Sequence, residues 1–219
     1  MSTFTAVAGS NATIGYAYYG SSTWNKGTSN GACQGAYQGT TASKSRVGVM
    51  VFSGAGDSLH GKIITGISLK ITCSKAGSGS SSKKLTFHRA NFQTLQTGIN
   101  GAAQVGGTLG TLTGQFYGNT VTHTLNASTN AALFSAMQDY FSEGNSALVL
   151  YNGETSSSTG YSSNYARVTT CVLTVTYIEA TVWYNHGGTW KQCAVWYNDN
   201  GIWRQVVPYC RTGGAWVRV

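Results

Sequence analysis

The stretch ARVTTCVLTVTY, residues 166–177, decides the fold class of this chain. Its residues alternate between two sets, with Val168, Thr170, Val172, Thr174 and Thr176 in one and Cys171, Leu173, Val175 and Tyr177 in the other. Successive side chains of a β-strand point to opposite faces, so this period of two predicts one long strand. The runs RVGVMVF at 46–52 and KIITGISLKITCS at 62–74 predict further strands of the same kind.

The composition supports an all-β chain with many turns. Its 219 residues are enough for one ordinary domain and a small appendage. Charged residues make up 9% of the chain, against about 25% in an average soluble domain. Glycine, serine, threonine, asparagine and tyrosine take their place, and aromatic and β-branched residues occur throughout, which argues against disorder.

The run at 62–74 leads to two local predictions. We expect Ile63, Ile67, Leu69 and Ile71 to face the core. The segment KKLTFHRA at 83–90 follows a loop rich in glycine and serine, KAGSGSSS. A loop of this composition between two strand-like runs predicts that 62–74 and 83–90 pair as a hairpin.

One helix is predicted, at residues 128–145. Ser128 or Thr129 is the expected N-cap, and Gly144 is the expected end. The apolar residues at helical spacing are Ala132, Leu133, Ala136, Met137, Tyr140 and Phe141. We expect the larger of these to cover one end of a β-sandwich.

The last stretch, VWYNHGGTWKQCAVWYNDNGIWRQVVPYCRTGGAWVRV at 182–219, repeats one unit three times. Three sets of residues are spaced 13 apart: Trp190, Trp203 and Trp216; Trp183, Trp196 and Tyr209; and Gly188, Gly201 and Gly214. Each unit predicts two short strands around a tight turn, and the three units predict a small β-meander. We therefore divide the chain into a domain at 1–178 and a repeat module at 179–219. The module has little core of its own. We therefore expect it to be stabilised by packing against the sandwich, a partner or copies of itself.

Two resemblances follow from these residues. The order ATIGYAYY, SRVGVMVF, ITGISLKITCS, a short helix, ALVLYNG and VLTVTY resembles the jelly-roll sandwiches of the DNRLRE and carbohydrate-binding-module type. That resemblance implies a jelly-roll fold used for binding or assembly. The units GGTWKQC, NGIWRQV and GGAWVRV resemble the C-terminal repeats of structural proteins in tailed bacteriophages. The third unit differs, because Val217 stands where the others carry a basic residue.

Charge, cysteines and the N-terminus bear on localisation. The net charge of +8 is spread without a basic cluster, so no specific nucleic-acid binding is expected. Five cysteines without zinc-site spacing indicate free, mostly buried thiols and folding in a reducing cytosol. The first 20 residues lack the pattern of a secretory signal, and no run approaches 18 apolar residues, so we expect no membrane insertion. A virion component that folds in the host cytoplasm and is released by lysis fits these features together.

No catalytic, cofactor or metal site is predicted. GDSLHGK at 56–62 resembles a phosphate-binding loop, but Ile63 replaces the serine or threonine and a β run follows. The six acidic residues are dispersed along the chain, and each of the four histidines is isolated. Neither a glycosidase pair nor a calcium loop is visible in this pattern.

The sequence therefore predicts a non-enzymatic structural protein of a bacteriophage particle, in its tail, baseplate or head surface. It would act in assembly or host attachment. Its expected partners are other virion proteins, copies of itself in a homo-oligomer and bacterial surface glycans. The expected binding residues are Trp183, Trp190, Trp196, Trp203, Trp216, Tyr161 and Tyr165. A carbohydrate-binding module of a larger system remains the alternative, and a hydrolase with scattered catalytic residues is a third possibility.

Overall fold

The computed structural model describes residues 1–9, 13–20, 23–27, 31–36, 45–75, 83–93, 104–114, 119–151, 166–179, 181–206, 209–212 and 215–218. The elements of the larger part are β1 (Ser2–Ala8), β2 (Ile14–Gly20), β3 (Thr23–Gly27), β4 (Ala32–Ala36), β5 (Ser45–Val51), α1 (Ala55–Leu59), β6 (Ile63–Lys75), β7 (Lys83–Ala90), β8 (Val105–Gly114), β9 (Thr120–Leu125), α2 (Ala131–Ser142), β10 (Ala147–Leu150) and β11 (Ala166–Ile178). The repeat module follows as β12 (Thr181–His186), β13 (Thr189–Asp199), β14 (Ile202–Val206), β15 (Tyr209–Thr212) and β16 (Ala215–Arg218).

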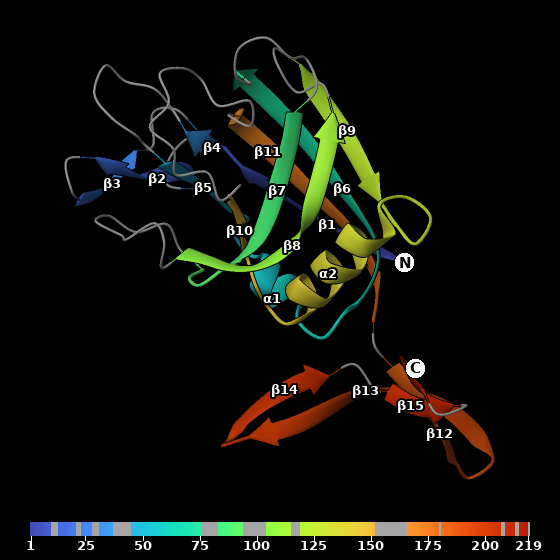
Figure 1. The fold of residues 1–219 in the computed structure, drawn as a ribbon. Coiled ribbons are helices and arrows are strands. Elements are labelled where there is room, and N and C mark those ends of the chain that lie inside the picture. The colour runs from blue at the N-terminus through green and yellow to red at the C-terminus, as the bar shows by residue number, and fades with distance from the viewer. Residues whose placement is uncertain are drawn as a thin grey trace.

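The larger part is an antiparallel, jelly-roll-like β-sandwich, as predicted (Figure 1). In one layer β11 pairs with β1 and β6, and β6 pairs with β9. In the other layer the order is β8, β7, β10, β5, β2 and β3. The short strand β4 pairs with both β5 and β11, so it joins the two layers.

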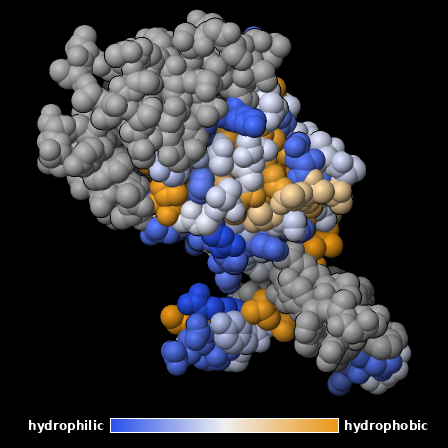
Figure 2. Space-filling model, viewed as in Figure 1, coloured by the Kyte–Doolittle hydropathy of each residue, from blue (hydrophilic) through white to orange (hydrophobic). Residues whose placement is uncertain are grey.

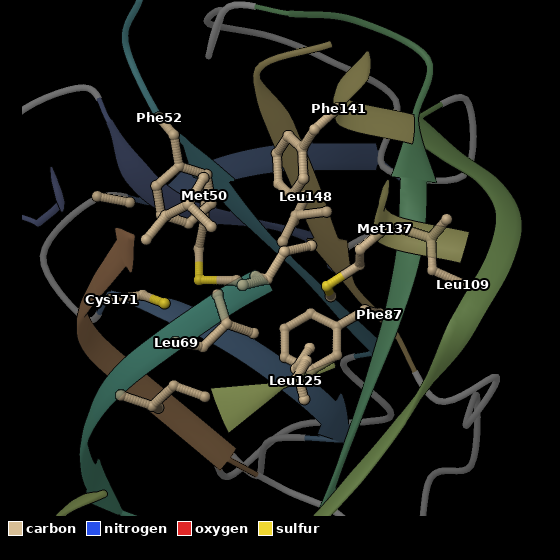
Figure 3. Packing of buried hydrophobic residues seen from close by; sticks show 14 of the residues in the cluster. Met50, Phe52, Leu69, Phe87, Leu109, Leu125, Met137, Phe141, Leu148 and Cys171 are labelled. Atoms are coloured by element: carbon tan, nitrogen blue, oxygen red, sulfur yellow. The ribbon is translucent and has the colours of Figure 1, made fainter. Parts of the chain in front are cut away.

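The core lies between the two layers and is closed by α2 (Figure 3). β6 and β11 contribute Ile67, Leu69, Ile71, Cys171, Leu173 and Val175 from one side, and Met50, Leu85, Phe87 and Leu148 face them from the other. The opposite face of β5 is also buried, through Val47, Val49 and Val51. Both faces of this strand are therefore removed from water, which explains its continuous apolar run.

Register shifts in the pairing of β11 with β6 change which residues face the core. Val168 is buried, whereas Thr170, which belongs to the same alternating set, is only partly buried. The reason is that the pairing of β11 with β6 shifts register between Val168 and Thr170. A second shift lies between Thr176 and Tyr177. It puts Ile64 in the core at 0% exposure. Ile63, which was predicted to face the core, is only partly buried, so that prediction was wrong. One extra residue in a strand reverses which side chains face inward.

The predicted hairpin between 62–74 and 83–90 was also wrong. β6 pairs with β11 and β9, whereas β7 pairs with β8 and β10 in the other layer. The two strands are neighbours in sequence but belong to opposite layers. A glycine- and serine-rich connection permits a crossover as readily as a tight turn.

The predicted helix is α2, and it covers one end of the sandwich as expected. It contacts β6 and β9 of one layer and β8 of the other. Leu133, Phe134, Met137, Tyr140 and Phe141 are its buried residues. Its end at Gly144, with φ +92°, confirms the predicted glycine stop.

The predicted N-cap of α2 was wrong. The cap residue is Asn130, which is left-handed at φ 53° and makes no side-chain cap. Asn126 instead accepts hydrogen bonds at its Oδ1 from the amides of Ser128 and Thr129. An asparagine side chain that bonds its own downstream backbone favours a turn, and this turn delays the helix.

The helix α1 was not predicted. It spans five residues and overlaps the stretch that resembles a phosphate loop, and it buries Ala55 and Leu59 against the sandwich. Two buried residues one turn apart are too few to produce a helical pattern in the sequence. This short helix nevertheless positions the candidate site.

The three repeats form three hairpins in one common register. Trp183 pairs with Gln192, Trp196 with Gln205 and Tyr209 with Arg218, each 13 residues further along the chain. The first two turns, Gly187-Gly188 and Asn200-Gly201, have positive φ at both residues, as a type I′ turn requires. The first two hairpins share β13 in a three-stranded sheet, and the third forms a separate two-stranded sheet.

Candidate functional site

Among the side chains of the module that the structure describes, the large exposed apolar ones lie on the hairpin of β13 and β14. Directly paired residues share a face, so Trp196, Asn198 and Trp203 lie on one face, and Trp196 and Trp203 are diagonal neighbours. Trp196 is 53% exposed and Trp203 is 65% exposed. Tyr197 and Ile202, on the other face, are 47% and 59% exposed. A two-stranded hairpin offers no layer that could cover either face.

The other predicted binding residues are placed only in part. Trp183 lies in β12, Trp190 in β13 and Trp216 in β16, at positions that match the pattern of the second hairpin. Their side chains lie outside what the structure describes. Tyr161 and Tyr165 lie wholly outside the described residues, so their predicted binding role stays a prediction.

An open cleft of about 530 Å³ separates the sandwich from this hairpin. The hairpin side is formed by Trp196, Ile202, Trp203 and Arg204, and the sandwich side by Gly56, Asp57, His60, Lys62, Glu143 and Gly144. Figure 1 shows the hairpin below the end of the sandwich that carries α1 and α2. Figure 2 shows hydrophilic residues gathered on the sandwich surface that faces it. The hairpin side of the cleft thus combines two tryptophans and Ile202 with Arg204, and the sandwich side is polar.

Close backbone contacts fix the sandwich side of the cleft. The Gly56 amide donates to Oγ of Ser146 at 2.8 Å, and the Gly61 amide donates to the Ser142 carbonyl at 2.9 Å. A Cβ atom on Gly56 would lie 2.5 Å from the carbonyl oxygen of Gly144. The first turn of α1 therefore lies directly on the turn that ends α2. This packing holds Asp57 and Glu143 on one surface although they are far apart in sequence.

Three ion pairs compensate most charges around the cleft. Arg89 donates to both oxygens of Glu143, at 2.6 and 3.2 Å, and these hydrogen bonds raise the pKa of Arg89 above its usual value. Arg204 pairs with Asp199 at 3.2 Å. Lys62 pairs with Glu179, the first residue of the module, and this ion pair connects the module to the sandwich side of the cleft. Within the described part of the chain, Asp57 has no hydrogen bond or ion pair, and its carboxylate remains available.

Sequence reasoning identified the tryptophans and missed the polar side of the cleft. Asp57, His60 and Lys62 belong to a stretch that was rejected as a phosphate loop, and Glu143 lies within the predicted helix. No spacing in the sequence signals that these residues meet. Their proximity follows from the packing of α1 on α2, which tertiary contacts decide.

Burial determines the reactivity of the cysteines in the core. Burial raises the pKa of the Cys171 thiol to about 12, so it stays protonated and is a poor nucleophile. Cys33, Cys73 and Cys171 are buried and form no disulfide, as predicted for these three. No group of three potential metal ligands is found among the described residues. None of the described helices has the length and apolar character needed to cross a membrane.

No protein-family model matches the chain, and neither does any curated protein.

Proposed function

We propose that this protein is a non-enzymatic structural component of a bacteriophage particle that assembles through its C-terminal hairpins. The observation that carries the proposal is the exposed apolar surface of the β13–β14 hairpin. Trp196, Tyr197, Ile202 and Trp203 are each about half exposed or more. Large exposed apolar groups on a structure with so little core favour burial against another molecule.

The repetition of the hairpins supports an assembly role. The three hairpins share one register, so each presents equivalent positions for an aromatic residue and a tryptophan. Tryptophan is enriched among the residues that dominate binding energy at protein interfaces. Copies of the same chain provide matching surfaces, and a closed symmetric oligomer would cover the parts of them that lie outside the cleft. The resemblance of these repeats to those of phage structural proteins supports the virion assignment.

Immunogold electron microscopy tests the virion assignment. Particles released by lysis of the host that encodes the chain are purified on a density gradient and labelled with an antibody raised against the full chain. We expect gold at one fixed location on the particles, and no gold after the antibody is absorbed with the purified protein. Protein found only in the soluble fraction of the lysate would contradict the proposal.

A further inference from the structure

We infer that the cleft between the α1–α2 end of the sandwich and the β13–β14 hairpin binds a neutral saccharide within a longer glycan. The cleft goes beyond the proposed assembly role, because it lies within a single chain and needs no second copy. Its lining combines aromatic faces on one side with hydrogen-bonding groups on the other. Pyranose rings need this combination, since each presents apolar C–H faces and a rim of hydroxyl groups.

The aromatic side comes from Trp196 and Trp203. They are diagonal neighbours on one face of the hairpin, and both line the cleft. More than half of each side chain is exposed, so ring surface is available to a ligand. The electron-rich face of an indole attracts the weakly positive C–H groups of a sugar ring, and burying this surface removes apolar area from water.

The polar side supplies both hydrogen-bond acceptors and donors. Asp57 and Glu143 contribute carboxylates, and His60 and Lys62 contribute nitrogen atoms. Both Glu143 oxygens already accept bonds from Arg89, and Asn145 donates to one of them. Asp57 is the carboxylate left available, so we assign it as the acceptor for sugar hydroxyls. A bond from a hydroxyl to a carboxylate is charge-assisted and stronger than one between neutral groups.

The balance of charge favours a neutral ligand over an anionic one. A phosphate or nucleic acid requires uncompensated cations, but Lys62 is paired with Glu179 and Arg204 with Asp199. The volume of about 530 Å³ lies within the range of small-molecule sites. Because the cleft is open rather than enclosed, a segment in the middle of a chain can enter it. A glycan meets these requirements of charge, size and shape.

Binding to oligosaccharides tests the inference. The labelled full-length protein is applied to an array of neutral, amino-bearing and acidic oligosaccharides, and the neutral glycan retained best is titrated by calorimetry. We expect Trp196→Ala and Trp203→Ala each to weaken binding about tenfold or more, because each removes one stacking surface. Asp57→Asn should weaken it by about tenfold. The matched control is Tyr197→Ala, an exposed aromatic residue of the same hairpin that does not line the cleft, and it should change affinity less than about twofold.

Three results would overturn the inference. No retention of any neutral glycan would exclude the ligand class. An equal loss for Tyr197→Ala and Trp203→Ala would show that binding does not use the cleft. Displacement of the glycan by tetramethylammonium would assign the tryptophans and Asp57 to a cationic ligand instead. Thermal melting of each variant checks that the fold is kept, and immunogold labelling of particles reports on the virion assignment independently.

Discussion

Replacing Phe141 with alanine is expected to lower the free energy of unfolding by about 3–5 kcal/mol. Phe141 lies on α2 at 0% exposure, and its ring makes an edge contact with Phe52 at a centroid distance of 6.5 Å. The surrounding strands cannot close over the space that the ring leaves, so the loss includes both apolar burial and a cavity. Urea unfolding followed by circular dichroism measures the change.

Two further variants make the Phe141 result specific. Phe141→Leu keeps most of the volume and should cost about 1.5 kcal/mol or less. Ser135→Ala, on the exposed face of the same helix, should change stability by less than about 0.5 kcal/mol. A loss below about 1 kcal/mol for Phe141→Ala would mean that α2 does not close the core as described.

Replacing Gly31 with alanine is expected to cost about 3 kcal/mol or more, from overpacking together with backbone strain. Gly31 has φ +69°, and a Cβ atom there would lie 2.1 Å from the carbonyl oxygen of Val168. The neighbouring residue Ala32 pairs with Val168, where β4 joins the two layers. The new methyl group would therefore push β4 away from β11. For a chain of this size the midpoint of thermal unfolding should fall by roughly 6–12 °C.

Gly107 provides the matched control for Gly31. It lies exposed on β8, and a Cβ atom there would meet nothing within 4 Å. Gly107→Ala should leave stability unchanged or raise it by up to about 1 kcal/mol, because alanine restricts the unfolded chain. Equal melting temperatures for the two alanine variants would rule out the close approach of β4 to β11.

The sequence predicted the strands better than their partners. Alternation in 166–177 and 62–74 identified β11 and β6, because each has one face in the core. The register shifts that bury Val168 and Ile64 left no local signal, since they arise from how the two strands fit together. The pairing of β7 with β8 and β10 depends on contacts between distant segments, which a loop composition cannot specify.

The repeat module was predictable in its turns and register. Its 13-residue period and the glycine-containing turns specify three equivalent hairpins. Their grouping into sheets was less evident. Residues 189–199 run without a break from the first hairpin into the second, whereas Pro208 stands between β14 and β15 in the sequence. Proline has no amide hydrogen to donate to a strand ladder, and this favours separating the third hairpin.

The sequence could not predict the cleft, because its residues come from distant parts of the chain. Its two tryptophans stand out as repeated residues, but Asp57 and Glu143 come from separate helices. They line one cleft because Gly56 lies against Gly144 and Ser146. The six acidic residues are dispersed in sequence, and dispersal along a chain does not imply separation in space.

The solution mass of the full chain, compared with that of residues 1–178, tests the assembly claim most directly. Both are measured by light scattering after size exclusion, and circular dichroism checks that the shorter chain folds. We expect the full chain to be an oligomer and residues 1–178 to be a monomer. A full chain that stays monomeric at high concentration, or a shorter chain that still associates, would contradict assembly through the C-terminal hairpins.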